Sequence, residues 1–285
     1  MKKALTIFLV LAVMFCVGQA AAFAAEEGFA VVDNDSVSFT VLAQERAADS
    51  DYLWTVHIAN KTDAEMMLTM SNVVLDGLRA EPFWGVAVAA DTEVDTVLCW
   101  YGKDLAAAGL GDLESATVAA FDLLAYNRED REAPGYVDDA FTVQFAEEAT
   151  FFAYTPTEGD MQALDNDACA MYITSLGVDE SGLATARMVL VNKADYAIRF
   201  VVTDTYVGTE PFQSFTMDET VPANATAITS SSWSEFSTNW MRDHGFYDEA
   251  GNIRSDLPFT MNMIITNNDD VTADTLLAEA VTAAR

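Results

Sequence analysis

Residues 54–63 read Trp-Thr-Val-His-Ile-Ala-Asn-Lys-Thr-Asp, an alternating stretch that ends in a polar turn. Trp54, Val56 and Ile58 alternate with smaller or more polar residues. A period of two is typical of a β-strand with one buried face, and Asn and Asp are favoured in the turns that end strands. This stretch therefore predicts a half-buried strand that closes in a tight connection.

The same turn recurs later in the chain. Residues 192–195 read Asn-Lys-Ala-Asp, an offset of 132 from the Asn-Lys-Thr-Asp of residues 60–63. The triad Asp-Asn-Asp recurs at the same offset, at 33–35 and again at 165–167. Trp100 and Trp233 lie 133 positions apart, and the two Glu-Pro-Phe triads, at 81–83 and 210–212, lie 129 apart. Matches at nearly one offset predict two related units in tandem.

Each unit contains many short alternating segments separated by turn residues, as in an antiparallel sandwich. We therefore expect an all-β chain of two tandem Ig-like antiparallel β-sandwiches, the first at residues 25–146 and the second at 147–285. The Cys, Trp, Cys spacing of antibody domains is absent. Residues 149–154, in the expected linker region, are a possible additional strand.

A short helix is expected to connect two strands in each unit. In the first unit it covers 103–108 and stops at Gly109. In the second, Ser232 and Glu235 form a capping-box pattern, and Gly245 is the stop.

The N-terminus reads as a secretory signal peptide. Lys2 and Lys3 precede an apolar run over 4–17, and small residues follow up to Ala24. The run is short for a membrane span, and the small residues predict cleavage near Ala24, so residues 1–24 are assigned to the signal. We expect a secreted or extracytoplasmic protein, at the cell surface or in the periplasm, with no transmembrane segment in the mature chain.

The charge excludes one class of partner. The chain has 45 Asp and Glu against 14 Lys and Arg, a formal net charge of -31. Proteins bind nucleic acid through Lys and Arg that neutralise phosphates, so no nucleic-acid binding is expected.

The turn and strand signatures at 33–35, 60–63, 75–77, 81–84 and 89–92 resemble an uncharacterised family of secreted Ig-like β-sandwich domains from gut-type anaerobic bacteria. The resemblance covers most of the mature chain. It implies a fold and carries no catalytic residues across.

No enzyme activity is expected. Histidine is the commonest general base, and the chain has only His57 and His244, neither with a convincing partner in the sequence. His57 lies within a strand, and its counterpart in the second unit is Val189. His244 closes the second short helix, where a cation suits the helix dipole. Motifs for a serine nucleophile, zinc, nucleotide phosphate or a CxxC redox pair are missing, so catalytic residues, cofactors and metal ligands are all predicted as none.

Metal binding is the alternative function. The Asp/Asn turns at 33–35, 165–167 and 267–270 offer oxygen ligands for calcium, but turns use the same residues for structure. Met66, Met67 and Met70 near His57 suggest copper. Their counterparts at offset 132 include Ile198 and Val202, which favours a core role for Met66 and Met70.

Cysteines and aromatics complete the candidates. Cys99 and Cys169 could pair in an oxidising compartment, but each lies in an alternating apolar stretch, and we expect free thiols.

Trp84 and Tyr101 are the candidate binding residues, since rigid rings supply contact area. Trp84 corresponds to Gln213, which suggests exposure, although packing at the rim of the core is the competing interpretation.

The sequence thus predicts an exported non-enzymatic protein that recognises an unknown protein or glycan ligand. Extracytoplasmic calcium or copper binding is the alternative, and a spacer that only positions a neighbour is the third.

Overall fold

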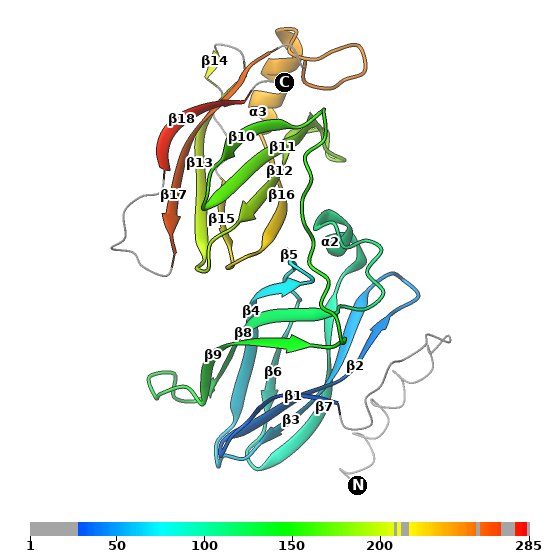
Figure 1. Cartoon of the computed structure of the whole chain (residues 1–285), viewed down its shortest axis with the longest axis vertical. Helices are drawn as coiled ribbons and strands as arrows, with labels where there is room; N and C mark the ends of the chain where they lie inside the picture. Colours follow the sequence, from blue (N-terminus) through cyan, green and yellow to red (C-terminus); the bar gives the residue numbers. More distant parts are fainter. Residues whose placement is uncertain (1–27, 208–209, 212–216, 255–256, 269–276, 284–285) are drawn as a thin grey trace.

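The computed structural model describes residues 28–207, 210–211, 217–254, 257–268 and 277–283 (Figure 1). In these residues the chain is mostly β-strand, in three sheets whose strands pair antiparallel except at one bridge, which confirms the all-β prediction. No helix in these ranges is long and apolar enough to cross a membrane. The predicted signal peptide, residues 1–24, lies outside the described residues.

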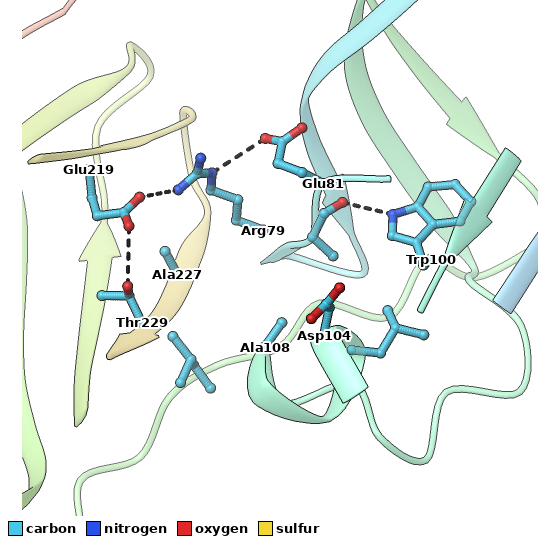
Figure 2. A pocket seen from close by; sticks show the side chains of 11 residues that line it. Arg79, Glu81, Trp100, Asp104, Ala108, Glu219, Ala227 and Thr229 are labelled. Carbon is cyan, nitrogen blue, oxygen red and sulfur yellow. Dashed lines mark hydrogen bonds and ion pairs between the residues drawn. The ribbon is translucent and has the colours of Figure 1, made fainter. Parts of the chain in front are cut away.

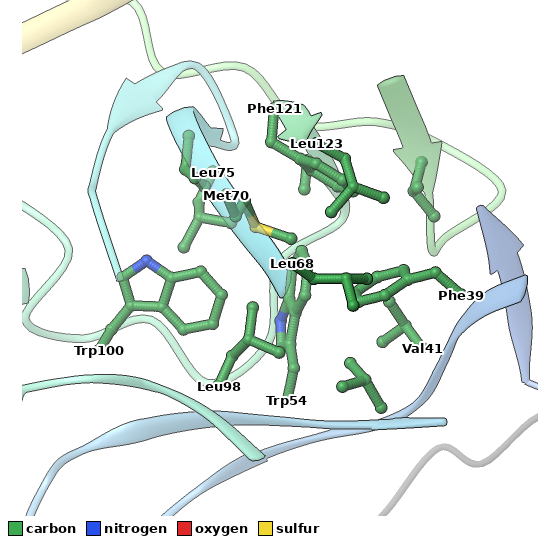
Figure 3. Packing of buried hydrophobic residues seen from close by; sticks show 14 of the residues in the cluster. Phe39, Val41, Trp54, Leu68, Met70, Leu75, Leu98, Trp100, Phe121 and Leu123 are labelled. Carbon is green, nitrogen blue, oxygen red and sulfur yellow. The ribbon is translucent and has the colours of Figure 1, made fainter. Parts of the chain in front are cut away.

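Two sheet faces enclose the core of the first unit. One sheet has the order β1-β2-β3-β7 and the other the order β5-β4-β8-β9, with β6 also paired to β4. The strands are β1 (Phe29–Asp33), β2 (Val37–Arg46), β3 (Tyr52–Asn60), β4 (Met66–Leu75), β5 (Leu78–Arg79), β6 (Gly85–Val88), β7 (Thr92–Trp100), β8 (Val118–Asn127) and β9 (Val137–Gln144). Trp54, Phe39 and Val41 of one sheet meet Leu68 and Leu123 of the other (Figure 3). The predicted strand at residues 54–58 is thus confirmed, with its apolar side buried.

The second unit has the same strand order. Its sheets run β10-β11-β12-β16 and β14-β13-β17-β18, with β15 also paired to β13. The strands are β10 (Met161–Asp165), β11 (Cys169–Val178), β12 (Ala184–Asn192), β13 (Ile198–Val207), β14 (Glu210–Pro211), β15 (Met217–Val221), β16 (Thr226–Ser232), β17 (Phe259–Asn267) and β18 (Leu277–Ala283). A separate core surrounds Phe200, Trp233 and Phe259. Each unit therefore has its own apolar core.

The repeated turn has the same hydrogen bonds in both units. The buried Asn60 amide donates to the carbonyls of Ala64, Val88 and Ala89 at 2.8–3.1 Å. The Asn192 amide donates to three carbonyls in the same way, those of Tyr196, Val221 and Pro222. Each amide ties the end of one strand to two other segments, so the motif fixes the closure of the sandwich.

A second feature recurs at the bulges of β4 and β13. Asn72 and Asp204, 132 positions apart, both have positive φ, 53° and 47°, which Asn and Asp tolerate better than most residues. Asn72 donates to Asp122 of β8 at 2.6 Å, whereas Asp204 accepts from Asn262 of β17 at 3.1 Å. The hydrogen bond is thus present in both units, but the donor lies at the bulge in the first unit and on the neighbouring strand in the second.

The two units meet along the edge of one sheet. Thr226 of β16 pairs parallel with Leu78 of β5, and its amide donates to the Gly77 carbonyl at 2.8 Å. This bridge joins strands of both units into one nine-stranded sheet (Figure 1).

The linker between β9 and β10 contains no strand, so the possible strand at 149–154 is not formed. The Tyr154 ring lies 5.3 Å from the Tyr172 ring on the outer face of β11. That cover explains why β11 is buried on both faces from Cys169 to Ile173, where simple alternation predicted one buried face.

Candidate functional site

A pocket of about 280 Å³ lies between the two units (Figure 2). The first unit contributes β5, the residues after it, the end of β7 and the short helix α2 (Gly102–Ala107), and the second contributes β15 and β16. Its lining comprises Arg79, Ala80, Glu81, Trp100, Asp104, Leu105, Ala108, Glu219, Ala227, Ile228 and Thr229. The junction thus forms the pocket, and neither unit has it alone.

Helix α2 is placed in the junction by its ends and by one buried side chain. Tyr101 is its N-cap residue, Leu105 is buried, and Gly109 beyond its end has φ 85°, as expected of a helix stop. A Cβ on Gly109 would come within 2.8 Å of the Ile228 side chain, so the second unit packs closely there. The predicted helix at 103–108 is confirmed with its bounds shifted by one residue.

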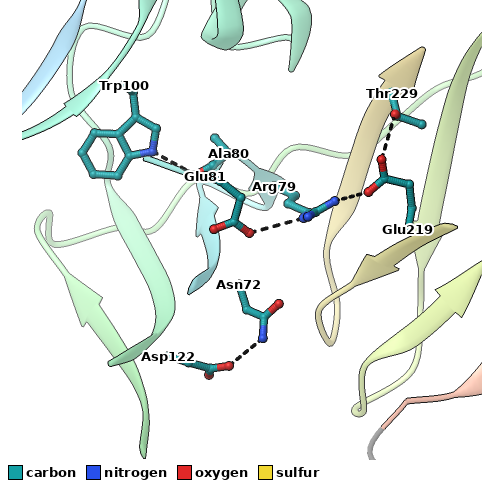
Figure 4. A network of polar contacts seen from close by, with 8 residues as sticks. All are labelled: Asn72, Arg79, Ala80, Glu81, Trp100, Asp122, Glu219 and Thr229. Carbon is teal, nitrogen blue, oxygen red and sulfur yellow. Dashed lines mark hydrogen bonds and ion pairs between the residues drawn. The ribbon is translucent and has the colours of Figure 1, made fainter. Parts of the chain in front are cut away.

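A network around Arg79 crosses the junction (Figure 4). The Arg79 guanidinium contacts Glu81 Oε1 at 3.4 Å through Nε and donates to Glu219 Oε2 through Nη1. Glu219 Oε1 accepts from the Thr229 hydroxyl at 3.2 Å. Burial raises the pKa of Glu81 above its usual range, while the nearby Arg79 opposes that shift. The guanidinium therefore holds two of the three pocket carboxylates, and the contact joins the units.

The Trp100 indole closes the inner wall of the pocket. Its Nε1 donates to the Ala80 carbonyl at 2.8 Å, and the residue is 2% exposed (Figure 2). The counterpart Trp233 is also buried, and its Nε1 donates to the Thr205 hydroxyl at 3.1 Å. Both matched tryptophans are therefore core residues.

Two aromatic side chains are exposed on segments that also contribute residues to the pocket. Phe83 is 77% exposed and Tyr101 is 41% exposed, with ring centroids 6.2 Å apart. An isolated bridge joins the backbone of Phe83 to that of Cys99 in β7, and Tyr101 is the N-cap residue of α2. We call Phe83 and Tyr101 the aromatic pair. Large exposed apolar side chains that lie together often mark interaction sites.

The predicted binding residues are thus divided. Tyr101 belongs to the aromatic pair, but Trp84 is half-buried and packs edge-to-face on Phe39 at 6.0 Å. Trp84 thus packs at the rim of the core, as the competing interpretation stated. The exposed aromatic side chain is that of its neighbour Phe83. The repeated Glu-Pro-Phe motif at 81–83 contains Phe83 and could have indicated this site. From the sequence alone, the motif was interpreted only as a turn signature.

His57 does have partners, contrary to the expectation. Its Nδ1 lies 2.8 Å from Asp95 Oδ1, and its Nε2 lies 3.9 Å from Glu93 Oε2. Both carboxylates belong to β7, which pairs with β3 and sets Asp95 directly opposite His57. Sequence spacing could not show this contact because the residues are 38 positions apart.

His244 ends helix α3 (Glu235–Asp243), as predicted. Its ring stacks on Trp240 at 3.8 Å with an interplanar angle of 8°. The capping-box prediction was wrong about the first residue. Ser234 is the N-cap and accepts from the Ser237 amide, while Ser232 belongs to β16 and donates to Asp179 at 2.8 Å.

The Asp/Asn turns have structural partners. Lys61 Nζ lies 2.5 Å from Asp33 Oδ1, and Lys193 pairs with Asp165 in the same way. The Asn34 side chain accepts from two backbone amides at 2.8 Å. Among the described residues, no group of three or more His, Cys, Asp or Glu could hold a metal ion. Of the third turn, residues 269–270 lie outside the described ranges.

Met66 and Met70 are buried in the first core, and their counterparts Ile198 and Val202 are buried in the second. This confirms the core role inferred from the repeat.

Cys99 and Cys169 are both free, as expected. Burial raises the pKa of each thiol to about 11.

No protein-family model matches the chain, and the search of curated proteins likewise gave no match. Function is therefore argued from the site itself. The arrangement offers two exposed rings and a small pocket that contains three carboxylates, which suits binding through contact area and hydrogen bonds.

Proposed function

We propose that the chain is an exported, non-enzymatic protein of two duplicated Ig-like β-sandwich units that recognises a protein or glycan through the aromatic pair. One observation carries the proposal. Phe83 is 77% exposed and Tyr101 is 41% exposed, with their ring centroids 6.2 Å apart. Rigid aromatic side chains give a large contact area at a low cost in conformational entropy.

The shared strand order and the matched Asn60 and Asn192 contacts support duplication of one unit. Antiparallel strands in two layers over one core support the sandwich architecture of each copy. The turn signatures add the resemblance to secreted Ig-like domains of gut-type anaerobic bacteria, and the residues before Ala24 support export. The proposed localisation is the cell surface, the periplasm or the medium.

The pocket adds polar contacts beside the rings. Glu81 lies two positions before Phe83, and Asp104 lies three positions after Tyr101, and both line the pocket. Arg79 neutralises part of this charge through Glu81 and Glu219, so the pocket keeps an excess of carboxylates. The pocket therefore offers a ligand few hydrogen-bond donors and several carboxylate acceptors. This charge disfavours anionic ligands such as nucleic acid or acidic lipid.

The experiment is a binding screen of residues 25–285 against glycan and protein arrays. The variants are Phe83→Ser with Tyr101→Ser, and Phe151→Ser serves as the matched control because Phe151 is 64% exposed but lies in the linker. We expect the screen to find a ligand. The Phe151→Ser control should bind it as tightly as the unmodified protein, and the double variant should bind it at least about tenfold more weakly. Reproducible turnover of a substrate panel, or binding unaffected by the double variant, would overturn the proposal.

A further inference from the structure

The outer edge of β7 carries backbone groups that pair with nothing. This strand ends its sheet, so β3 covers only one of its sides, and the Phe83 amide donates to the Cys99 carbonyl from the other side at 3.0 Å. Backbone groups alternate between the two sides of a strand, so those of Glu93, Asp95 and Val97 face the same way as those of Cys99. In the described part of the chain, no backbone hydrogen bond reaches these three residues from that side. We call their outward backbone groups the β7 edge.

The second unit shows what the matching edge accepts. Its corresponding strand is β16, which pairs with β12 as β7 pairs with β3. At the offset of 133 that relates the two core tryptophans, Thr226 of β16 corresponds to Glu93. The Thr226 amide donates outward to the Gly77 carbonyl, and Thr226 forms its bridge with Leu78 of β5. Because β5 belongs to the first unit, this edge accepts an extended segment from outside its own unit (Figure 1).

The segment that occupies the β16 edge is apolar and then basic. Leu78 forms the bridge, and the guanidinium of the next residue, Arg79, donates to Glu219 of the second unit. A carboxylate of the accepting unit thus pairs with a cation of the added segment. The β7 edge presents two carboxylates on the strand itself, because the Glu93 and Asp95 side chains are 71% and 67% exposed.

The side chains along the β7 edge select the charge of the occupant. Acidic side chains on an edge strand repel an added strand of the same charge and pair with a basic one across the strands. His57 contacts both carboxylates, at 2.8 Å to Asp95 and 3.9 Å to Glu93, and leaves most of their oxygen surface open. Val97 is 40% exposed on the same face and adds apolar area. The net charge of -31 opposes pairing with a second copy of this chain.

We propose that the β7 edge binds an extended segment of a partner protein, with Lys or Arg at alternate positions, as an added strand of the sheet. The outward backbone groups of β7 supply main-chain hydrogen bonds, which give affinity in strand addition, and side chains at alternate positions give specificity. Basic side chains of the segment pair with Glu93 and Asp95, and an apolar one packs on Val97. The proposal depends on the backbone of β7 and so goes beyond recognition by the aromatic pair.

The test uses the full protein and a fluorescently labelled peptide in which Val, Lys and Lys alternate with Thr, followed by anisotropy. Two further peptides carry N-methyl groups on alternate amides, one on each side of the extended chain, and have the same charge. Only one side of an added strand can face β7. We therefore expect one methylated peptide to bind at least about tenfold more weakly and the other to bind like the unmethylated peptide. A peptide with Glu in place of Lys should not bind.

Variants of the protein separate the β7 edge from general charge attraction. Glu93→Lys with Asp95→Lys should weaken binding about tenfold or more. Asp138→Lys with Asp139→Lys is the matched control, since it makes the same change in charge at two exposed positions of β9, another strand at the end of a sheet, and should bind nearly as the unmodified protein. Glu93→Gln with Asp95→Asn, which keeps the side-chain shapes, should also weaken binding, with the fold of each variant checked by circular dichroism.

Three results would overturn the proposal. They are equal binding of the two methylated peptides, an equal loss in the β9 control, and no binding of the unmethylated peptide at about 100 μM. The first would show that no main-chain pairing occurs, and the second that the attraction is not specific to the β7 edge.

Discussion

Arg79 of the first unit and Glu219 of the second form an ion pair across the junction, and each side chain is 26% exposed. The same guanidinium contacts Glu81 at 3.4 Å, so one cation lies between two carboxylates (Figure 4). Thr229 completes the network by donating to Glu219. A cation in this position links the short strand β5 to the strands β15 and β16.

Arg79→Ala should weaken the junction. We expect a loss of about 1–2 kcal/mol in the free energy of unfolding, because the change leaves two partly buried carboxylates near each other without a cation. Urea unfolding followed by fluorescence measures the loss. Arg199→Ala is the matched control, since the Arg199–Asp218 pair is about half exposed and lies within the second unit. A control effect as large as that of Arg79→Ala would argue against a special role of the junction pair.

Asn60→Ala and Asn192→Ala should destabilise their units equally. Each removes an amide that satisfies three carbonyls at 2.7–3.1 Å, and we expect about 3 kcal/mol for either change. Chemical denaturation gives the comparison. Asn127→Ala, which removes one local acceptor for the Glu129 amide, should cost less than about 1 kcal/mol. A small effect at either Asn60 or Asn192 would contradict the equivalence of the two turns.

The thiols should be unreactive at neutral pH. The pKa of Cys99 is raised to about 11 first by burial and then by Asp51, whose Oδ2 lies 3.7 Å from the sulfur. At pH 8 the thiolate is then roughly one part in a thousand, and its fraction rises tenfold per pH unit up to the pKa. The rate of modification by a thiol reagent, measured from pH 7 to 10, should follow that slope.

Asp51→Asn tests the contribution of the neighbouring carboxylate to this shift. It keeps the acceptor for the Gly102 amide, removes the charge, and should raise the rate at Cys99 but not at Cys169. Fast modification of unmodified Cys99 at pH 7 would contradict the raised pKa of this half-buried thiol.

Calcium should have almost no effect on stability. The carboxylates of Asp33 and Asp165 are paired with Lys61 and Lys193, so a cation would have to displace an existing partner. We expect millimolar Ca²⁺ or a chelator to change Tm by less than about 1 °C. Lys61→Met is the informative variant, because loss of the ammonium should lower stability without creating calcium dependence. A Tm increase of several degrees with Ca²⁺ would contradict this prediction and support the metal-binding alternative.

Much of the fold followed from spacing alone. The offset of 132 located matching strands and the core positions Met66 and Ile198, and the stop signals Gly109 and Gly245 lie just beyond the two helices. These features depend on local periodicity and on residues that favour one backbone conformation, so they are visible in a single sequence.

The candidate site was predicted only in part, because it depends on contacts between distant segments. Tyr101 was identified, but Phe83 was missed because the choice between it and Trp84 depends on which side chain covers Phe39. Arg79 and Glu219 are 140 positions apart and meet only when the units are joined. The partners of His57 were missed for the same reason, since β3 and β7 are adjacent in the sheet and not in the sequence.

The most direct test of recognition by the aromatic pair is a double-mutant cycle on Phe83 and Tyr101 with the ligand from the screen. Affinities are measured by calorimetry for the unmodified protein, Phe83→Ser, Tyr101→Ser and the double variant. Each single change should cost about 1–3 kcal/mol of binding free energy, and the double should cost measurably less than their sum, because rings 6.2 Å apart contact one ligand group together. Affinities unchanged in all three variants would contradict the account.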